Sequence, residues 1–147
     1  MPSPPRVIGT TEGAIALAEI ELRRALPDSF RSWLLQNNGK GLGSVTVFPV
    51  LDERDKRKTW DSIVRQHRLW QSYCEDVFAR KTEQLACLLP FAELGTGDYY
   101  CFDYSAVDST GEVRVVHWSH ETGDTTPRGE CFADFASRLE RGRFELD

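Results

Sequence analysis

The chain of 147 residues has no apolar run as long as the roughly 18 residues that a membrane-spanning helix needs. Its first residues, MPSPPRVIGT, also lack the apolar core of a secretion signal. These two absences argue against a membrane protein and against export. We therefore expect a cytoplasmic protein of about one domain in length, with no membrane partner.

Cysteine is present but never as a CxxC pair, the spacing that zinc and redox motifs typically use. The residues are Cys74, Cys87, Cys101 and Cys131, and two of them lie in strongly apolar segments. Free cysteine often behaves as a small buried hydrophobic residue, and cytosolic thiols stay reduced. A chain of this length also buries enough surface to fold unaided. We therefore predict no disulfide, no metal and no cofactor; a redox or metal role for the thiols is the alternative.

Glycine-rich nucleotide loops are missing as well. Gly95-Thr96-Gly97 lacks the third glycine of a dinucleotide-binding loop, and a predicted strand follows it where that motif needs a helix. We interpret it as a turn. The chain also contains no nucleophile elbow, phosphate-binding loop or zinc motif. These absences predict a protein that is not an enzyme.

The best remaining candidate for metal or acid–base chemistry is the segment His117-Trp118-Ser119-His120-Glu121. Side chains of a strand alternate between faces, so His117 and His120 cannot share a metal unless the strand ends or bulges between them. A single histidine would need Asp103 or Glu121 within hydrogen-bond reach to act as an acid or base. We predict neither a metal site nor a catalytic residue here.

Basic residues are scarce between residues 93 and 134, where Arg114 and Arg128 stand against nine acidic residues. The acidic residues are Glu93, Asp98, Asp103, Asp108, Glu112, Glu121, Asp124, Glu130 and Asp134. This segment carries a net charge of −7, within a chain whose total is −5. Nucleic-acid binding relies on lysine and arginine, so the segment argues against such a partner. It suits a basic protein partner; the alternative is acidic turns and strand ends that only contact solvent.

Three stretches of the first half carry apolar residues at helical spacing. A hydroxyl at residue 10 or 11 can cap the first of them. Pro27 fits the first turn of the second, which ends at Asn37-Asn38-Gly39. The third and longest covers residues 60–78, and His67 lies on its apolar stripe. We expect His67 to be a partly buried core residue rather than a catalyst.

Strands are predicted between turn signals at residues 44–50, 85–91, 98–105, 112–120 and 125–128. A closing helix covers residues 132–139. Because the helices and most strands are segregated along the chain, we predict a single α+β domain. Trp33, Trp70 and Phe135 lie on the apolar stripes of their helices, so we predict that they are core residues.

The stretch GDYYCFDYS combines aromatic bulk with two carboxylates. One face of such a strand carries Tyr99, Cys101 and Asp103, and the other carries Asp98, Tyr100, Phe102 and Tyr104. Bulky residues on both faces predict a central strand. We expect helices over one face and a partly exposed aromatic surface on the other, with the two aspartates at the ends of the strand.

Four segments occur in the order ALPDSFRSWLLQNNGKGLG, LLPFAELGTGDYYCFDYS, GEVRVVHWSHETGD and CFADFASRL. They combine a Leu-Pro-acid turn into a helix that ends in Asn-Gly, a Gly-Asp-Tyr strand opening, a Val-Val-x-Trp-x-His-Glu strand and a Phe-x-x-Phe helix. In this combination the chain resembles the SUKH superfamily, the domains similar to the yeast cell-wall assembly regulator. The resemblance extends from about Thr11 to Leu139.

The resemblance implies an α+β fold with a mixed, mostly antiparallel sheet packed against helices. We assign the SUKH-like domain to residues 10–147 and expect the Pro-rich residues 1–9 to be flexible. Stand-alone bacterial members are immunity proteins, which bind and neutralise a cognate polymorphic toxin, commonly a nuclease or deaminase. Fungal members are regulatory scaffolds with long disordered flanks, which this sequence does not show. The resemblance carries no catalytic residues with it.

We predict a partner-binding surface that is acidic and rich in aromatic residues, and that faces a basic toxin. Its candidate residues are Asp98, Tyr100, Asp103, Trp118, His120, Glu121 and Asp124. The alternative is a regulatory or scaffold domain that binds a peptide or a small ligand in a groove beside the same strands.

Overall fold

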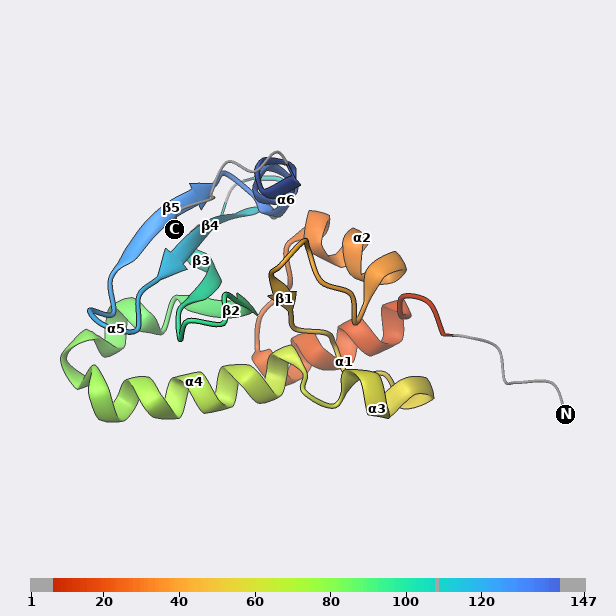
Figure 1. The fold of residues 1–147 in the computed structure, drawn as a ribbon, viewed down its shortest axis with the longest axis horizontal. Coiled ribbons are helices and arrows are strands. Elements are labelled where there is room, and N and C mark those ends of the chain that lie inside the picture. The colour runs from red at the N-terminus through yellow and green to blue at the C-terminus, as the bar shows by residue number, and fades with distance from the viewer. Residues whose placement is uncertain (1–6, 108, 141–147) are drawn as a thin grey trace, which may run out of the picture.

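The chain forms one antiparallel sheet with helices on both faces (Figure 1). The computed structural model describes residues 7–107 and 109–140. The helices within them are α1 (Glu12–Leu22), α2 (Asp28–Asn37), α3 (Lys56–Thr59), α4 (Ile63–Val77), α5 (Thr82–Leu85) and α6 (Phe132–Glu140). The strands are β1 (Thr46–Val47), β2 (Leu88–Glu93), β3 (Tyr99–Val107), β4 (Val113–Trp118) and β5 (Thr125–Gly129). The predicted single α+β domain is confirmed.

The strands follow one another in the sheet in their order along the chain, β1-β2-β3-β4-β5. Every pairing between the described strands is antiparallel, so the sheet is more regular than the mixed sheet that we expected. Cys101 of β3 lies opposite Pro90 of β2 and Val116 of β4. The strand with two bulky faces is therefore central, as predicted.

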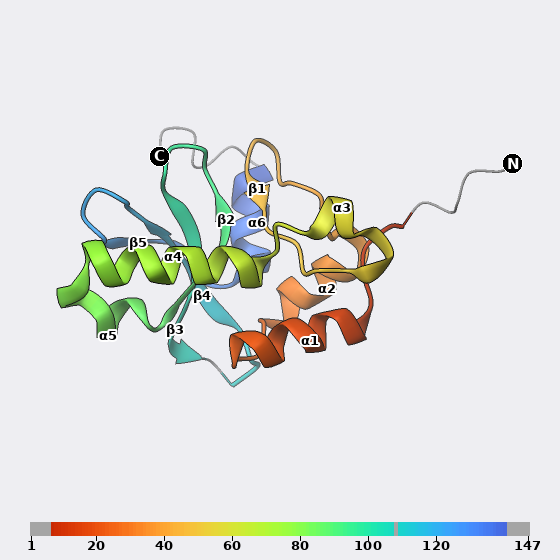
Figure 2. The same ribbon diagram turned by 90° about the horizontal axis from the view of Figure 1, so that it is seen from below.

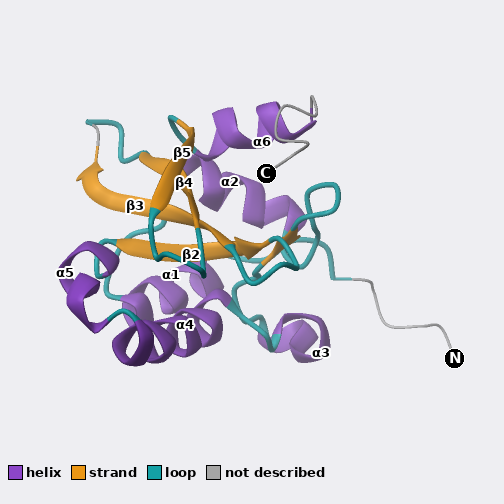
Figure 3. Cartoon of the chain, turned by 60° about the vertical axis from the view of Figure 1, so that its left-hand side comes forward, coloured by secondary structure: helices purple, strands orange, loops and turns teal. Residues whose placement is uncertain are grey.

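Helices cover both faces of this sheet. Figure 3 shows α2 and α6 on one side of the strands and α1, α4 and α5 on the other, and α4 crosses the strands in Figure 2. Tyr100 and Phe102 belong to the core on the side of α2 and α6, whereas Cys101 belongs to the core under α4. The expectation of a partly exposed aromatic face on β3 is therefore wrong, because the longest helix covers that face.

Hydroxyl groups cap two of the helices on this framework. The Oγ1 atom of Thr11 accepts a hydrogen bond of 3.1 Å from the backbone N–H of Ala14, at the start of α1. The Oγ atom of Ser62 accepts one of 3.2 Å from Arg65, at the start of α4. Each bond satisfies one of the N–H groups that a helix start leaves without a partner.

Helix α2 takes its cap from a distant part of the chain. It begins after Pro27, which provides no side-chain cap. The carboxylate of Glu112 accepts hydrogen bonds from the backbone N–H of Ser29 at 2.8 Å and from its hydroxyl at 2.7 Å. Glu112 directly precedes β4 and is 83 residues away. A negative charge also suits a helix N-terminus, so this contact ties the start of α2 to the sheet.

The larger core has an aromatic part between the sheet and helices α2 and α6, and it also takes in apolar residues of α1 and of the first turn of α4. The rings of Phe91 and Phe102 stack with their centroids 4.1 Å apart. Phe30 of α2 meets Phe102 edge-on at 5.0 Å, and Phe135 of α6 meets Tyr100 at 4.7 Å. The prediction that Phe135 is a core residue is confirmed.

A smaller core lies under α4 and contains Trp70, Cys74, Leu85, Leu88, Cys101, Val116 and Trp118. Trp70 is thus a core residue, as predicted, but Trp33 is only partly buried at the edge of the larger core. All four cysteines are free thiols, and burial raises the pKa of Cys74 to about 12. Cys74 and Cys101 fill space among apolar side chains, which is the structural role that we predicted for the thiols.

The helix predicted at residues 60–78 and the strand predicted at residues 44–50 are both shorter than expected. Trp60 is 58% exposed and precedes α4, where its ring lies 4.7 Å from the guanidinium of Arg65. The predicted strand at residues 44–50 is reduced to β1. Phe48 still donates its N–H to the carbonyl of Phe91, but Pro49 has no N–H and cannot continue the ladder.

Residues 1–6 of the segment that we expected to be flexible, and residues 141–147 of the predicted domain, lie outside the described residues. Gly9 is buried, and a Cβ atom at this position would lie 1.8 Å from the carbonyl oxygen of Leu35. The hydroxyl of Thr10 donates a hydrogen bond of 2.8 Å to Asp52. The chain is therefore already held against α2 at residue 9. In the described ranges, no helix has the length and apolar character needed to cross a membrane.

The two cores predict how aromatic substitutions change the free energy of unfolding. Replacing Trp70 or Phe135 by alanine should lower it by about 3–5 kcal/mol, because each change leaves a cavity in a buried site. Trp33→Ala should cost less, because its ring is partly exposed. Trp60→Ala is the control and should cost no more than about 1 kcal/mol, the value of its contact with Arg65. Chemical denaturation measures all four, and equal losses would contradict this assignment.

Candidate functional site

Asp98 connects two turns at one end of the sheet. It precedes β3, at the end of the turn that contains Gly95 and Gly97. Its Oδ2 atom lies 2.8 Å from Nε2 of His117, and its Oδ1 atom lies 2.5 Å from Nδ1 of His120. Oδ1 also accepts a hydrogen bond of 2.9 Å from the backbone N–H of His120. One carboxylate thus holds the β2–β3 turn to the end of β4.

The convergence of the two histidines depends on where β4 ends. His117 lies within the strand, opposite Tyr100 of β3, whereas the strand ends at Trp118. His120 therefore no longer follows the alternation of the strand, and it turns back toward Asp98. This is the condition under which we expected the two rings to come together. Asp103 lies farther along β3, opposite Arg114, and is not the partner of either histidine.

Asp98 is held in its ionised form. Burial alone would raise its pKa, but hydrogen bonds from the backbone of His120 and from the two imidazole rings outweigh burial, so the pKa lies below its ordinary value. An ionised carboxylate only accepts hydrogen bonds, so both ring nitrogens donate to it. The described residues contain no group of three or more ligands arranged to hold a metal. The hydrogen bonds of Asp98 therefore hold the turn before β3 to the turn after β4.

Gly97 makes the close approach of His120 possible. Its φ is +99°, a conformation that side chains rarely adopt, and a Cβ atom there would lie 3.1 Å from Nδ1 of His120. The glycine that looked like part of a nucleotide loop is thus needed for the turn and for the histidine next to it.

A groove opens beside His120, between α4 and the ends of β3 and β4. Its volume is about 300 Å³, and its lining residues include Leu69, Tyr73, Tyr99 and His120. Trp118 forms its floor and is only 1% exposed. The ring of Trp118 lies 5.8 Å from that of Phe78 and 6.4 Å from that of Tyr73.

The outer surface of α4 next to this groove is apolar. Leu69, Tyr73 and Val77 are spaced four residues apart and are 52%, 43% and 52% exposed. We call these three residues the α4 strip. Residues four apart lie on the same side of a helix, so the side chains form a continuous line along it. Val77 thus lies within the helix predicted at residues 60–78 but not on its buried side, which is formed by Ile63, Val64, Trp70 and Cys74.

The seven candidate residues differ in how far their side chains are exposed and in what they contact. Tyr100 and Trp118 are 2% and 1% exposed, so α6 and α4 cover the two aromatic rings that we expected on a surface. His120 borders the groove, and Glu121 and Asp124 are exposed in the turn between β4 and β5. Asp98 is bound to the histidines, and Asp103 is a partly buried residue of β3. Binding of a partner by any of them stays a prediction.

Most acids of the second half are engaged by neighbouring groups, so they do not form one open acidic face. Glu112 caps α2, and Asp124 lies 2.6 Å from Nζ of Lys81. Asp134 lies 3.2 Å from the guanidinium of Arg138. Glu121 is exposed and forms no ion pair with another described residue. It is therefore the clearest free charge of the predicted surface.

The α4 strip was not among the candidate residues that we named from the sequence. The signal for it was present, because Leu69, Tyr73 and Val77 recur every fourth residue on a helix whose buried stripe already contains Trp70 and Cys74. A second apolar line on the same helix, offset from the buried one, indicates a surface that contacts something else.

The described residues form an α+β domain, in which a five-stranded antiparallel meander lies between two layers of helices. Comparison with protein families places the chain in the SMI1 / KNR4 family (SUKH-1), which it matches over residues 9–138. The chain belongs to this family, and the predicted relationship to the SUKH superfamily is confirmed. A comparison with curated proteins gave no match. Membership is consistent with a domain of the immunity type or the regulatory type.

The carboxylate of Asp98 predicts a pH-dependent loss of stability. Asp98→Asn should lower the free energy of unfolding by about 1–3 kcal/mol at neutral pH, because hydrogen bonds from two partly buried histidines to a charged acceptor are lost. The pKa of Asp98 is depressed in the fold, so its stabilisation is complete above the ordinary value of 3.8 and is lost as pH falls below it. The difference between the two proteins should shrink in that range.

Asp103→Asn is the matched control, because Asp103 lies in the strand that Asp98 precedes and its side chain is buried to a similar extent. It accepts a hydrogen bond from Ser105 and lies 3.9 Å from Arg114. Its loss should be smaller than that of Asp98→Asn. Urea denaturation across a pH series would contradict this role of Asp98 if the two variants behaved alike.

Proposed function

We propose that this protein is a non-enzymatic immunity protein, which binds and neutralises a cognate bacterial polymorphic toxin in the cytoplasm. The toxin would be of the nuclease or deaminase type. Two findings support the proposal: the family to which the chain belongs, and the exposed α4 strip beside an acidic turn. The α4 strip is the observation that carries it, because a line of large apolar side chains on a surface typically marks a protein contact.

The α4 strip continues onto the turn between β4 and β5. Phe78, just after α4, packs against Gly123. A Cβ atom on Gly123 would lie 3.0 Å from the ring of Phe78. Lys81 donates hydrogen bonds to the carbonyl of Thr122 and to the carboxylate of Asp124. These contacts hold the turn next to the C-terminal end of α4. An apolar centre with a polar rim is the usual arrangement of a protein interface.

The rim of this surface suits a basic partner. Glu121 is exposed in the turn, and Asp76 is exposed on α4 near the α4 strip. Charges of one sign at the edge of an interface speed association with an oppositely charged partner. The partner would thus be drawn by the acids and held by the apolar side chains.

We propose that the protein acts by occupying the toxin rather than by turning over a substrate. The polar groups of Asp98, His117 and His120 are bound to one another, which suits a scaffold for the surface. Of the predicted residues, His120, Glu121 and Asp124 would contact the toxin directly. Tyr100 and Trp118 would support the surface from inside the fold.

A second candidate is a regulatory or scaffold domain that binds a peptide or a small ligand in the groove. The volume of about 300 Å³ and the aromatic lining favour it. The indole N–H of Trp118 is buried and finds no acceptor within the described part of the chain. This nitrogen atom has almost no exposed surface, so a ligand carbonyl in the groove would accept its hydrogen bond only after a neighbouring side chain moves. Saturable binding of such a ligand by the wild-type protein, with no toxin present, would favour this candidate.

The test uses the toxin encoded beside the gene of this protein, with association and dissociation rates measured across a salt series. Tyr73→Glu should raise the dissociation rate by at least about tenfold, because it places a charge at the centre of the apolar contact. Glu121→Lys should slow association, and this effect should fade at high salt. Co-expression should show protection of cells by the wild-type protein and not by Tyr73→Glu.

Leu17→Ser is the matched control, since Leu17 is also a large exposed apolar residue but lies on α1. It should leave both rates unchanged. Asp124→Lys is a poorer probe than Glu121→Lys, because it also removes the ion pair with Lys81. The proposed interface is wrong if Tyr73→Glu binds the toxin with wild-type rates. The proposed function is wrong if the toxin does not bind the wild-type protein.

A further inference from the structure

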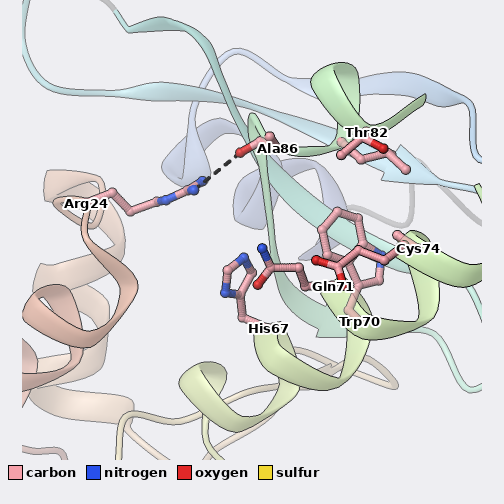
Figure 4. Close-up of a pocket in the computed structure, with 9 residues that line it drawn as sticks. Arg24, His67, Trp70, Gln71, Cys74, Thr82 and Ala86 are labelled. Carbon is pink, nitrogen blue, oxygen red and sulfur yellow. Dashed lines mark hydrogen bonds between the residues drawn. The ribbon is translucent and has the colours of Figure 1, made fainter. Parts of the chain in front are cut away.

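A second hollow lies on the side of α4 that faces the end of α1. Its volume is about 160 Å³, and residues of α4, α5 and the segment after α1 line it. Figure 4 shows that the side chains of Arg24, His67 and Gln71 point toward the same space. An engineered apolar cavity of about 150 Å³ holds a molecule the size of benzene, so this hollow has room for a small organic group.

The guanidinium of Arg24 is only partly satisfied here. Its NH2 group donates a hydrogen bond of 3.3 Å to the carbonyl of Ala86, and its plane lies 5.0 Å from the ring centroid of Tyr104. Its NH1 group is buried and has no acceptor among the described residues. A buried donor without an acceptor costs free energy, more so when it carries charge. Arg24 also lines the hollow, so an acceptor bound there would lie beside a guanidinium whose hydrogen-bonding capacity is not used up.

Arg24 and Glu75 are the charged residues that line the hollow itself, and Arg23, Arg68 and Glu21 lie around the neighbouring surface of His67. Burial and the nearby charges of Arg24 and Arg68 lower the pKa of His67 to about 4. The other charged groups that border His67 are Arg23 and Glu21 at the end of α1, and Glu75 on α4. Glu21 lies 3.9 Å from Arg68 and offsets part of its charge. From α5, the neighbours Thr82 and Leu85 carry no charge.

The other residues that line the hollow suit a ligand with an anionic group at one end and a short apolar chain at the other. Trp70, Cys74 and Leu85 line the inner end of the hollow and are buried side chains of the smaller core. One guanidinium matches one negative charge, and its planar donors suit a carboxylate. Gln71 adds an amide that can donate a second hydrogen bond.

We propose that this hollow binds a carboxylate carried on a short apolar stem, with Arg24 as its charge partner and Gln71 as a second donor. The carboxylate would belong to a free organic acid or to an acidic side chain of another protein. The site is separate from the α4 strip and from the Asp98 contact, and the inference does not depend on the proposed function.

Binding at this site is coupled to a proton. His67 is neutral at pH 7, because its pKa is about 4. A bound negative charge favours the protonated imidazole and raises that pKa. By linkage, the carboxylate then binds more tightly as pH falls from 7, until the ligand itself becomes protonated.

The test titrates the isolated protein with propionate and follows the histidine ring signals by NMR. The chain has three histidines, so His117 and His120 serve as internal references in the same spectrum. We expect saturable shifts of the His67 and Arg24 signals and a rise in the pKa of His67 in the bound state. Propionamide, which has no charge, should not bind. A blocked glutamate that bound more tightly than propionate would identify a protein side chain as the natural source.

Two variants test the roles of the residues. Arg24→Gln should weaken propionate binding at least about tenfold, because a charged hydrogen bond is lost. Gln71→Glu is nearly isosteric and provides a carboxylate from within the protein, so it should abolish binding and raise the pKa of His67 without ligand. Arg65→Gln, on an exposed position of α4, is the control and should bind as the wild type does. The proposal is overturned if wild-type protein shows no saturable shift, or if Arg24→Gln and wild type bind propionate equally.

Discussion

The burial of β3 on both faces is the constraint on which the rest of the structure depends. Tyr100 and Phe102 face the aromatic core under α2 and α6, while Cys101 faces the core under α4. The middle of the sheet, around Tyr100, Cys101 and Phe102, therefore has no free face for a ligand or a partner. Surfaces for binding remain on the helices and at the ends of the strands, which is where the α4 strip and the groove lie.

The elements of the fold could be predicted because their signals are local. Helical spacing located α1, α2 and α4, and turn residues separated the strands of the second half. The short helices α3 and α5 have too few residues to show a period, so no pattern indicated them. Trp60 was misplaced because a stripe of apolar residues does not show where a helix begins; Ser62 caps it two residues later.

The site was less predictable, because it depends on contacts between distant residues. Alternation correctly separated the two faces of β3, but it cannot tell what covers a face, so Tyr100 and Trp118 were expected on a surface and are buried. Asp98 meets a histidine 22 residues away only because β4 ends at Trp118. The four-residue spacing of Leu69, Tyr73 and Val77 was visible in the sequence, but spacing alone does not tell which apolar line of a helix is buried and which is exposed.

The cap that Glu112 provides for α2 also sets an order of events during synthesis. The backbone N–H of Ser29 leaves the ribosome 83 residues before its acceptor does. At roughly 5–20 residues per second, α2 waits about 4–17 s for the group that closes its first turn. During that time its aromatic side also lacks the strands against which it packs. The N-terminal helices thus gain their final form only once β4 has joined the sheet, so a nascent chain cut short before this point presents Phe30 to solvent and to proteases.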